Sequence, residues 1–172
     1  IKPYNFSRIK FENGVILNFK EVKYSKDYVW VRIRFGTGQR QIDPKFKAAV
    51  TLAPSLFVPG GLGKVSLDHL RNFNLNYQWG VGLIVDRESF ALLGDTRRPS
   101  LDREMETMTA FLADPGFRDS ANVRIPDLVD SLEQGLTDPT SKALLELSDM
   151  LGQGNWLGYP TKKELRATRM AD

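Results

Sequence analysis

The chain has 172 residues, of which 41% are hydrophobic and 26% charged, and this ordinary globular composition excludes a disordered tail. It contains no cysteine, which excludes a disulfide framework, a thiol nucleophile and a cysteine-based zinc site. The net charge is +3, and no apolar run approaches the ~18 residues that a membrane span needs. The length predicts one domain, residues 1–172, and a start at Ile1 rather than Met suggests a piece excised from a longer chain.

The basic residues are spread along the chain, whereas nucleic-acid binding usually needs a concentrated stripe. We therefore expect no nucleic-acid partner. The small basic groups are Lys20, Lys23 and Lys26, then Arg97 and Arg98, then Lys162 and Lys163.

Five strands are predicted, in two groups. Residues 7–21 form a hairpin around Asn13-Gly14, which is the strongest short turn signal. Residues 28–35 alternate, with Arg32 and Arg34 of one parity facing water and Val31, Ile33 and Phe35 of the other facing a core. Residues 78–94 form a second hairpin with a polar tip at 86–88.

Helices are predicted from caps and periodicity. Asp43-Pro44 starts a helix over 44–57 that is apolar nearly all round, so it should be buried, and Pro54 should kink or end it. Ser66 caps a short helix. A long helix opens near residue 99 with an apolar stripe and stops at 114–117; the stripe is Leu101, Met105, Met108, Phe111 and Leu112.

The C-terminal part is helical. Two amphipathic helices are expected at 125–136 and 141–151, the second broken by glycines at 152–154, and Thr161 with Glu164 forms a capping box for a last short helix. The order of elements predicts an α+β fold, with helices packed on one face of a mostly antiparallel sheet.

The glycines do not form a nucleotide-binding motif. A phosphate loop needs G-x-x-x-x-G-K-[ST], but the run at 60–64 is preceded by Val58 and followed by Val65. The pairs at 36 and 38 and at 80 and 82 lack the third glycine of G-x-G-x-x-G. We interpret these glycines as turn and close-packing residues.

No residue predicts a reaction. His69, beside Asp68, is the single histidine, and no H-E-x-x-H, H-x-x-E-H or G-x-S-x-G motif is present; we expect an exposed helix residue. Two carboxylate pairs, Asp102 with Glu106 and Asp86 with Glu88, are expected to be solvated rather than to act as acid and base. The tryptophans Trp30, Trp79 and Trp156 are interpreted as core or edge packing rather than a ligand platform.

Several segments together resemble the pitrilysin/insulinase-like zinc metallopeptidases, which include the mitochondrial processing peptidases. The match covers about residues 8 to 166, and each segment is degenerate. The segments are 12–15 with 18–20, 31–38, the apolar helix followed by 56–63, 66–67, 112–118, and 158–161 with 164–165.

The resemblance implies homologous α+β domains, commonly four in a chain, whose two halves close around a chamber. Only the first domain of that family carries H-x-x-E-H, on its first buried helix, with a further Glu downstream. The corresponding helix here, residues 48–57, has no His or Glu. The resemblance therefore implies a processing-peptidase-like, non-catalytic domain of the C-terminal half. It implies no catalytic, cofactor-binding or metal-binding residue in this chain, and it implies that zinc is bound by the catalytic domain of the parent protein. It should wall the chamber, pack on sister domains and help hold an unfolded peptide; exported bacterial members suggest the periplasm.

Two alternatives remain. The chain could be a catalytically dead subunit that pairs with a separate active peptidase chain, in which case a neighbouring chain rather than the same reading frame would carry H-x-x-E-H. It could also be a stand-alone module that binds peptides or small ligands, which predicts a stable monomer without a large exposed apolar face.

Overall fold

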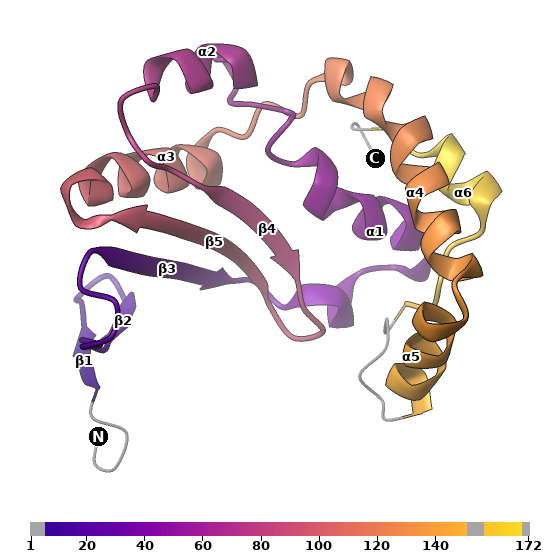
Figure 1. Cartoon of the computed structure of the whole chain (residues 1–172), viewed down its shortest axis with the longest axis horizontal. Coiled ribbons are helices and arrows are strands. Elements are labelled where there is room, and N and C mark those ends of the chain that lie inside the picture. The colour runs from indigo at the N-terminus through magenta and orange to yellow at the C-terminus, as the bar shows by residue number, and fades with distance from the viewer. Residues whose placement is uncertain (1–5, 151–156, 170–172) are drawn as a thin grey trace.

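The computed structural model describes residues 6–150 and 157–169 and shows an α+β chain whose elements form two groups (Figure 1). One group contains a three-stranded sheet with helices α2 (Leu67–Phe73) and α3 (Leu101–Ala113). The other contains α1 (Lys47–Leu56), α4 (Ile125–Thr137), α5 (Pro139–Met150) and α6 (Lys162–Ala167). The predicted fold class is confirmed. No helix in these ranges is long and apolar enough to cross a bilayer.

The N-terminal hairpin consists of β1 (Ser7–Lys10) and β2 (Ile16–Phe19), paired antiparallel with Ser7 opposite Phe19. The predicted turn is present: Gly14 has φ +87° and the Asn13 side chain accepts the Val15 N–H at 3.1 Å. Both strands are exposed, and they form a two-stranded sheet separate from the main one.

The main sheet has the order β3-β5-β4 and is antiparallel throughout. Its strands are β3 (Tyr28–Phe35), β4 (Val81–Val85) and β5 (Phe90–Arg97). Tyr28 lies opposite Arg97 in the β3–β5 pair, and Val81 lies opposite Gly94 in the β4–β5 pair. The predicted strand and second hairpin are confirmed, and β5 continues beyond Gly94 to Arg97.

Six α-helices follow the predicted order within the described ranges, and the bounds are α1 (Lys47–Leu56), α2 (Leu67–Phe73), α3 (Leu101–Ala113), α4 (Ile125–Thr137), α5 (Pro139–Met150) and α6 (Lys162–Ala167). A 3-10 helix (Pro44–Phe46), capped by the Asp43 side chain at 3.0 Å from the Lys45 N–H, leads into α1. Pro54 lies exposed inside α1, which ends two residues later. The glycines at 152–154 and Trp156 lie outside the described residues.

The core of the sheet group lies between α3 and one face of the sheet. Leu70, Leu92, Met108 and Phe111 are buried there, against half-buried neighbours that include Val31 and Ile33 as predicted. The predicted α3 stripe is partly wrong, since Met105 and Leu112 are 37% and 38% exposed. The buried face of α3 differs from the predicted stripe. It carries Glu104, Thr107, Met108 and Phe111, at i, i+3, i+4 and i+7.

The core of the helical group joins α1, α4 and α6. It consists of Ala48, Leu52, Leu56, Ala121, Ile125, Val129 and Leu165.

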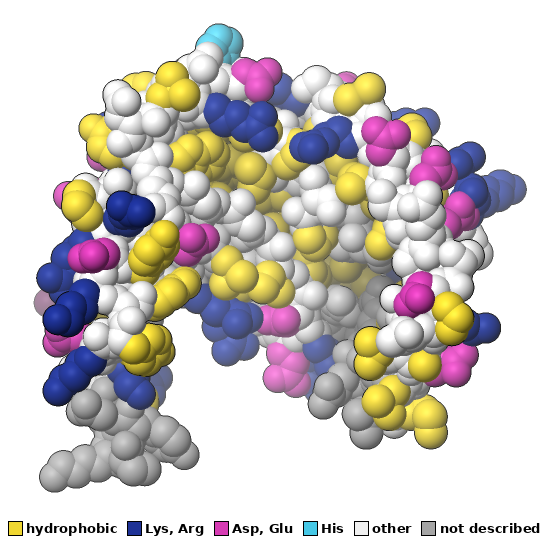
Figure 2. Space-filling view, in the orientation of Figure 1, with side chains coloured by type: hydrophobic (Ala, Val, Ile, Leu, Met, Phe, Trp, Pro, Cys, Tyr) yellow, Lys and Arg dark blue, Asp and Glu magenta, His cyan; other side chains and the backbone are white. Residues whose placement is uncertain are grey.

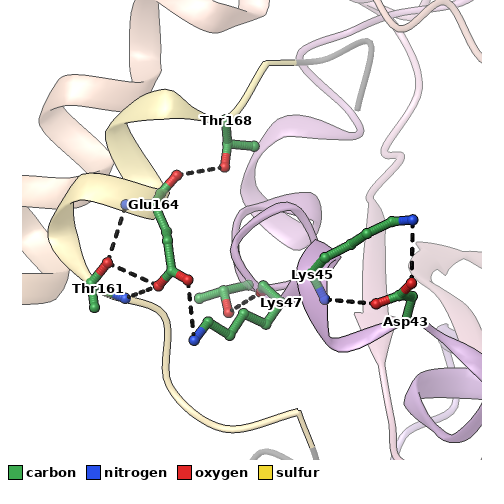
Figure 3. A network of polar contacts seen from close by, with 7 residues as sticks. Asp43, Lys45, Lys47, Thr161, Glu164 and Thr168 are labelled. Carbon is green, nitrogen blue, oxygen red and sulfur yellow. Dashed lines mark hydrogen bonds and ion pairs between the residues drawn. The ribbon is translucent and has the colours of Figure 1, made fainter.

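Polar contacts at the ends of α1 and α6 support the helical core (Figure 3). The capping box is present: Thr161 Oγ1 accepts the Glu164 N–H at 3.2 Å, and Glu164 accepts the Thr161 N–H at 2.6 Å. Glu164 also pairs with Lys47 of α1 at 3.2 Å. The backbone N–H of Thr161, together with its hydroxyl, lowers the pKa of Glu164. These contacts fix α6 against the start of α1.

Candidate functional site

The strongest candidate site is an apolar cleft of about 440 Å³ between α1 and the end of the sheet. Figure 2 shows hydrophobic side chains in the hollow between the sheet group and the helical group. The α1 side of the cleft comprises Phe46, Ala49, Val50, Ala53, Leu56 and Phe57, the sheet side comprises Phe35, Leu83, Val85 and Phe90, and Ile42, Phe117, Thr168 and Arg169 complete the lining.

Helix α1 has two apolar faces, and only one of them is buried. Ala48, Leu52 and Leu56 recur at helical spacing and pack into the helical core. Ala49, Val50 and Ala53 are half-buried and line the cleft. The expectation of a buried helix is therefore met on one face only, because the second apolar face lines the open cleft.

The sheet side of the cleft is formed by the β4–β5 hairpin. Leu83 and Val85 of β4 line the cleft and pack near α1. Within the described residues β5 is the one strand that pairs with β4, and at the other edge of β4 the Gln39 side chain donates to the Val85 carbonyl at 3.3 Å. The cleft therefore combines apolar side chains with a strand edge that can accept a further strand.

The turn after α1 is held by Arg118, which follows the cleft-lining Phe117 in the chain. Its Nη1 donates to the carbonyls of Gly60 at 3.1 Å, Val65 at 3.3 Å and Leu62, and its Nη2 donates to Gly63 at 2.9 Å. Glycine is required at 61, where φ is +67° and a Cβ would lie 2.7 Å from the Val65 carbonyl. The predicted turn role of these glycines is confirmed.

Phe117 lies beside Arg118 and connects this turn to the cleft. It has φ +43° and packs edge-on against Phe57 at 6.2 Å between ring centroids. The short sequence signal Asp-Pro-Gly before it predicted a helix stop but not that the aromatic ring would line a cleft.

The cleft does not offer a zinc site. Zinc in proteins is held by Cys, His and carboxylate ligands, and none of the residues that line the cleft is of these types. Groups of three or more His, Cys, Asp or Glu that could hold a metal are not found among the described residues. The residues present therefore do not fit the metal that the family resemblance implies for a catalytic domain.

His69 lies exposed on α2, away from the cleft-lining residues. Ser66 caps that helix as predicted, accepting the His69 N–H at 3.3 Å, and its hydroxyl lies 2.9 Å from His69 Nδ1. The imidazole thus contacts the cap of its own helix, and among the described residues no hydrogen bond or ion pair joins it to an acid or base of another element.

The two predicted carboxylate pairs are separate surface features. Asp102 and Glu106 are exposed on α3, and Glu106 pairs with Arg103 at 2.7 Å. At the hairpin tip, Asp86 pairs with Arg32 at 2.6 Å and Glu88 pairs with Arg40 at 3.1 Å. Their interpretation as groups that face water is consistent with these contacts, although Asp86 is half-buried.

Sequence patterns missed one buried acid, Glu104. Its side chain is fully buried, Oε2 accepts the Gly80 N–H at 3.1 Å, and Oε1 has no hydrogen-bond partner. Burial raises its pKa, the Gly80 bond opposes the increase, and the charge of Asp95 adds to it. The spacing of Glu104 from Thr107, Met108 and Phe111 places all four on one helix face and could have indicated its burial. A stripe defined by apolar residues alone leaves out Glu104 and Thr107.

Trp30 is 58% exposed on β3, an edge strand of the main sheet, where it stacks on Tyr28 at 6.2 Å between ring centroids. Of the two predicted environments, core or edge, it has the edge. Trp79 is half-buried against the sheet-group core, as predicted.

Comparison with solved structures gives the fold of protease domains. Neither a protein-family model nor a curated protein sequence matches the chain. The chain is similar to the periplasmic protease PqqL from Escherichia coli, with TM-score 0.72 and 12% identity over 98% of this chain and 19% of that one. It is similar to the first half of PqqL with TM-score 0.73 and 11% identity, covering 97% of this chain and 38% of that one.

A protease from Helicobacter pylori gives TM-score 0.69 and 9% identity, with 97% of this chain and 41% of that one covered. Another neighbour is the ferredoxin protease FusC, solved with Arabidopsis ferredoxin, at TM-score 0.61 and 13% identity over 95% of this chain and 18% of that one. At these identities the likeness establishes the fold. The chain spans less than half of the length of each neighbour.

Proposed function

We propose that the chain is a non-catalytic domain of an insulinase/pitrilysin-type zinc metallopeptidase, and that it walls a chamber for unfolded peptide and packs on sister domains. The observation that carries the proposal is the cleft face of α1, where Ala49, Val50 and Ala53 present only apolar side chains. In this family the first buried helix of the catalytic domain holds the zinc ligands. Here the equivalent surface is suited to apolar contact rather than to metal chemistry.

The cleft and the free edge of β4 support binding of an extended peptide. A peptide laid along β4 can form main-chain hydrogen bonds with the strand edge, and its alternate side chains can enter the apolar cleft beside Leu83 and Val85. Such recognition depends on backbone and bulk apolar contact, so it tolerates many sequences. The FusC neighbour, solved with ferredoxin, supports a protein or peptide as the substrate of the parent protein.

Exposed apolar side chains outside the cleft support packing on sister domains. The N-terminal hairpin exposes Ile9, Phe11, Val15, Ile16, Leu17 and Phe19, each by 43% to 55%. An isolated two-stranded hairpin is at best marginally stable in water, so this surface needs a cover. Helix α5 adds Leu144, Leu147 and Met150.

The neighbours set the wider context of the proposal. Each is a longer protease chain of which this fold forms less than half, which supports a parent peptidase with further domains. PqqL is described as periplasmic, and we propose the same compartment for the parent of this chain.

Metal analysis and a peptidase assay test the non-catalytic assignment. The purified chain, incubated with zinc and then desalted, should retain no stoichiometric metal and should leave a fluorogenic unfolded peptide intact. Retention of about one zinc per chain, removable by chelator together with peptidase activity, would overturn the assignment. Cleavage that appears only on addition of a separate chain carrying H-x-x-E-H would instead identify a dead partner subunit.

A further inference from the structure

The face of the sheet turned away from α3 carries a second concave site. Strand alternation places Trp30 and Arg32 on this face of β3, and their partners across β5 are Asp95 and Leu93. Gly82 of β4 lies opposite Leu93 on the other side. Val31 and Ile33, of the opposite parity, pack against the α3 side.

A groove of about 540 Å³ runs across this face, lined by Trp30, Val31, Arg32, Gly80, Val81, Gly82, Leu93, Gly94 and Asp95. Gly80 and Gly82 contribute no side chains, so the backbone of β4 and the Leu93 side chain form its floor. The exposed ring of Trp30 stands at its rim. The groove has room for a side chain because Gly80, directly before β4, and Gly82, within β4, have one parity and carry no side chain.

One acidic residue, Asp95, lines the groove, and a second, Glu104, lies behind its glycines on the α3 side of the sheet. The Asp95 carboxylate lies 3.2 Å from the position of a Cβ on Gly80 and forms no ion pair or side-chain hydrogen bond with a described residue. Buried Glu104 lies against Gly80 and Gly94 from the other face, with its Oε1 unpartnered. Two carboxyl groups on opposite sides of the same glycines favour a positive charge in the groove.

The neighbouring arginines do not neutralise these acids. Arg32 pairs with Asp86 at 2.6 Å, which turns its guanidinium toward the hairpin tip. Arg97 lies over the Tyr28 ring at 5.9 Å and, with Gln78, hydrogen-bonds its hydroxyl, which lowers the pKa of Tyr28.

We propose that this groove binds the side chain of a lysine or arginine carried by an extended peptide. The aliphatic stem lies on Leu93 and the glycine floor, and the cationic end lies between the Trp30 ring and the Asp95 carboxylate. The site is separate from the α1 cleft, and it rests on the proposed function only in assuming that the domain meets peptide. It would add a charge preference to otherwise sequence-tolerant binding.

A pair of labelled synthetic peptides tests the groove. Both are short, extended alanine–threonine chains, identical except for a central lysine or norleucine, and binding to the full chain is measured by fluorescence anisotropy at low salt. We expect the lysine peptide to bind about five- to tenfold more tightly. The preference should shrink as salt is added, because the Asp95 carboxylate is exposed to solvent.

Variants assign the preference to the groove. Gly82→Val fills the groove without disturbing the fold, since a Cβ there meets nothing within 4 Å, and valine suits a strand better than glycine. Asp95→Asn removes the charge. Both should abolish the lysine preference, whereas Gly135→Ala on α4 and Asp102→Asn on α3, which make similar changes elsewhere, should retain it.

Equal affinities of the wild-type chain for the two peptides would overturn the inference. So would a lysine preference that survives both Gly82→Val and Asp95→Asn, with folding of the variants verified by thermal unfolding. Neither result affects the apolar cleft, because peptide binding to the cleft is measured separately with cleft variants. Failure of this inference is therefore distinguishable from failure of the proposed function.

Discussion

Replacement of Arg118 by alanine tests whether one side chain organises the turn after α1. Its guanidinium donates to four carbonyls of the segment 60–65, and the Gly60 residue among them is buried. Hydrogen bonds from a charged donor contribute about 1.5–3 kcal/mol each. The bond to Gly63 is exposed to solvent, and all four bonds come from one guanidinium group, so their energies are not independent. The total contribution of the four bonds to stability is therefore smaller than four times that value.

We expect Arg118→Ala to lower the free energy of unfolding by about 3 kcal/mol. For a chain of this length that corresponds to a decrease in melting temperature of about 6–12 °C. Arg118→Lys keeps the charge but cannot span the carbonyls as a planar fork, so it should recover less than half of the loss. Urea denaturation followed by circular dichroism gives the free energies.

Arg124→Ala is the matched control. Arg124 is exposed at the end of the 3-10 helix Asp119–Arg124, and its loss should change stability by no more than about 0.5 kcal/mol. If Arg118→Ala is as stable as this control, the reasoning about the turn is refuted.

Two further predictions concern a buried acid and a helix cap. Burial raises the pKa of Glu104 above the ordinary value of 4.5, so the stabilisation of the folded state that is present below that pH is lost as pH rises toward the folded-state pKa. The free energies of unfolding of Glu104→Gln and the wild type should therefore be equal near pH 4. Above pH 4 the variant should become the more stable of the two, by at most about 1.4 kcal/mol per pH unit. Urea denaturation across pH checks this, and a difference independent of pH would contradict it. Thr161→Ala removes the cap of α6 and should lower the unfolding free energy by about 1 kcal/mol, while Thr161→Ser retains it; equal stability of the two variants would count against the capping box.

Local signals predicted the elements well because each depends on neighbouring residues. The Asn13-Gly14 turn, the alternation in β3 and the Thr161–Glu164 capping box all require only short-range contacts, and all three are present in the structure. The α+β class followed from the order of these elements.

The sites were not predictable in the same way because they depend on which surfaces tertiary packing leaves open. The apolar α1 sequence could not distinguish the buried Leu52 from the half-buried Val50, since both are aliphatic and only the position of the sheet separates them. Glu104 belonged to no predicted pattern, because its burial depends on the helix face that meets Gly80. The sequence left Trp30 as either a core or an edge residue, and only the order of the strands places it on an edge strand.

Hydrogen exchange with a bound peptide tests the central claim most directly. A synthetic, extended apolar peptide in excess should protect the amides of β4 (Val81–Val85) and should be recovered uncleaved. Ala49→Trp, which fills the cleft, should weaken that peptide by at least about tenfold, equivalent to about 1.4 kcal/mol, whereas Ala113→Trp at the exposed end of α3 should not. Cleavage of the peptide, or protection of β4 that is unchanged by Ala49→Trp, would contradict a non-catalytic domain that holds peptide in the α1–β4 cleft.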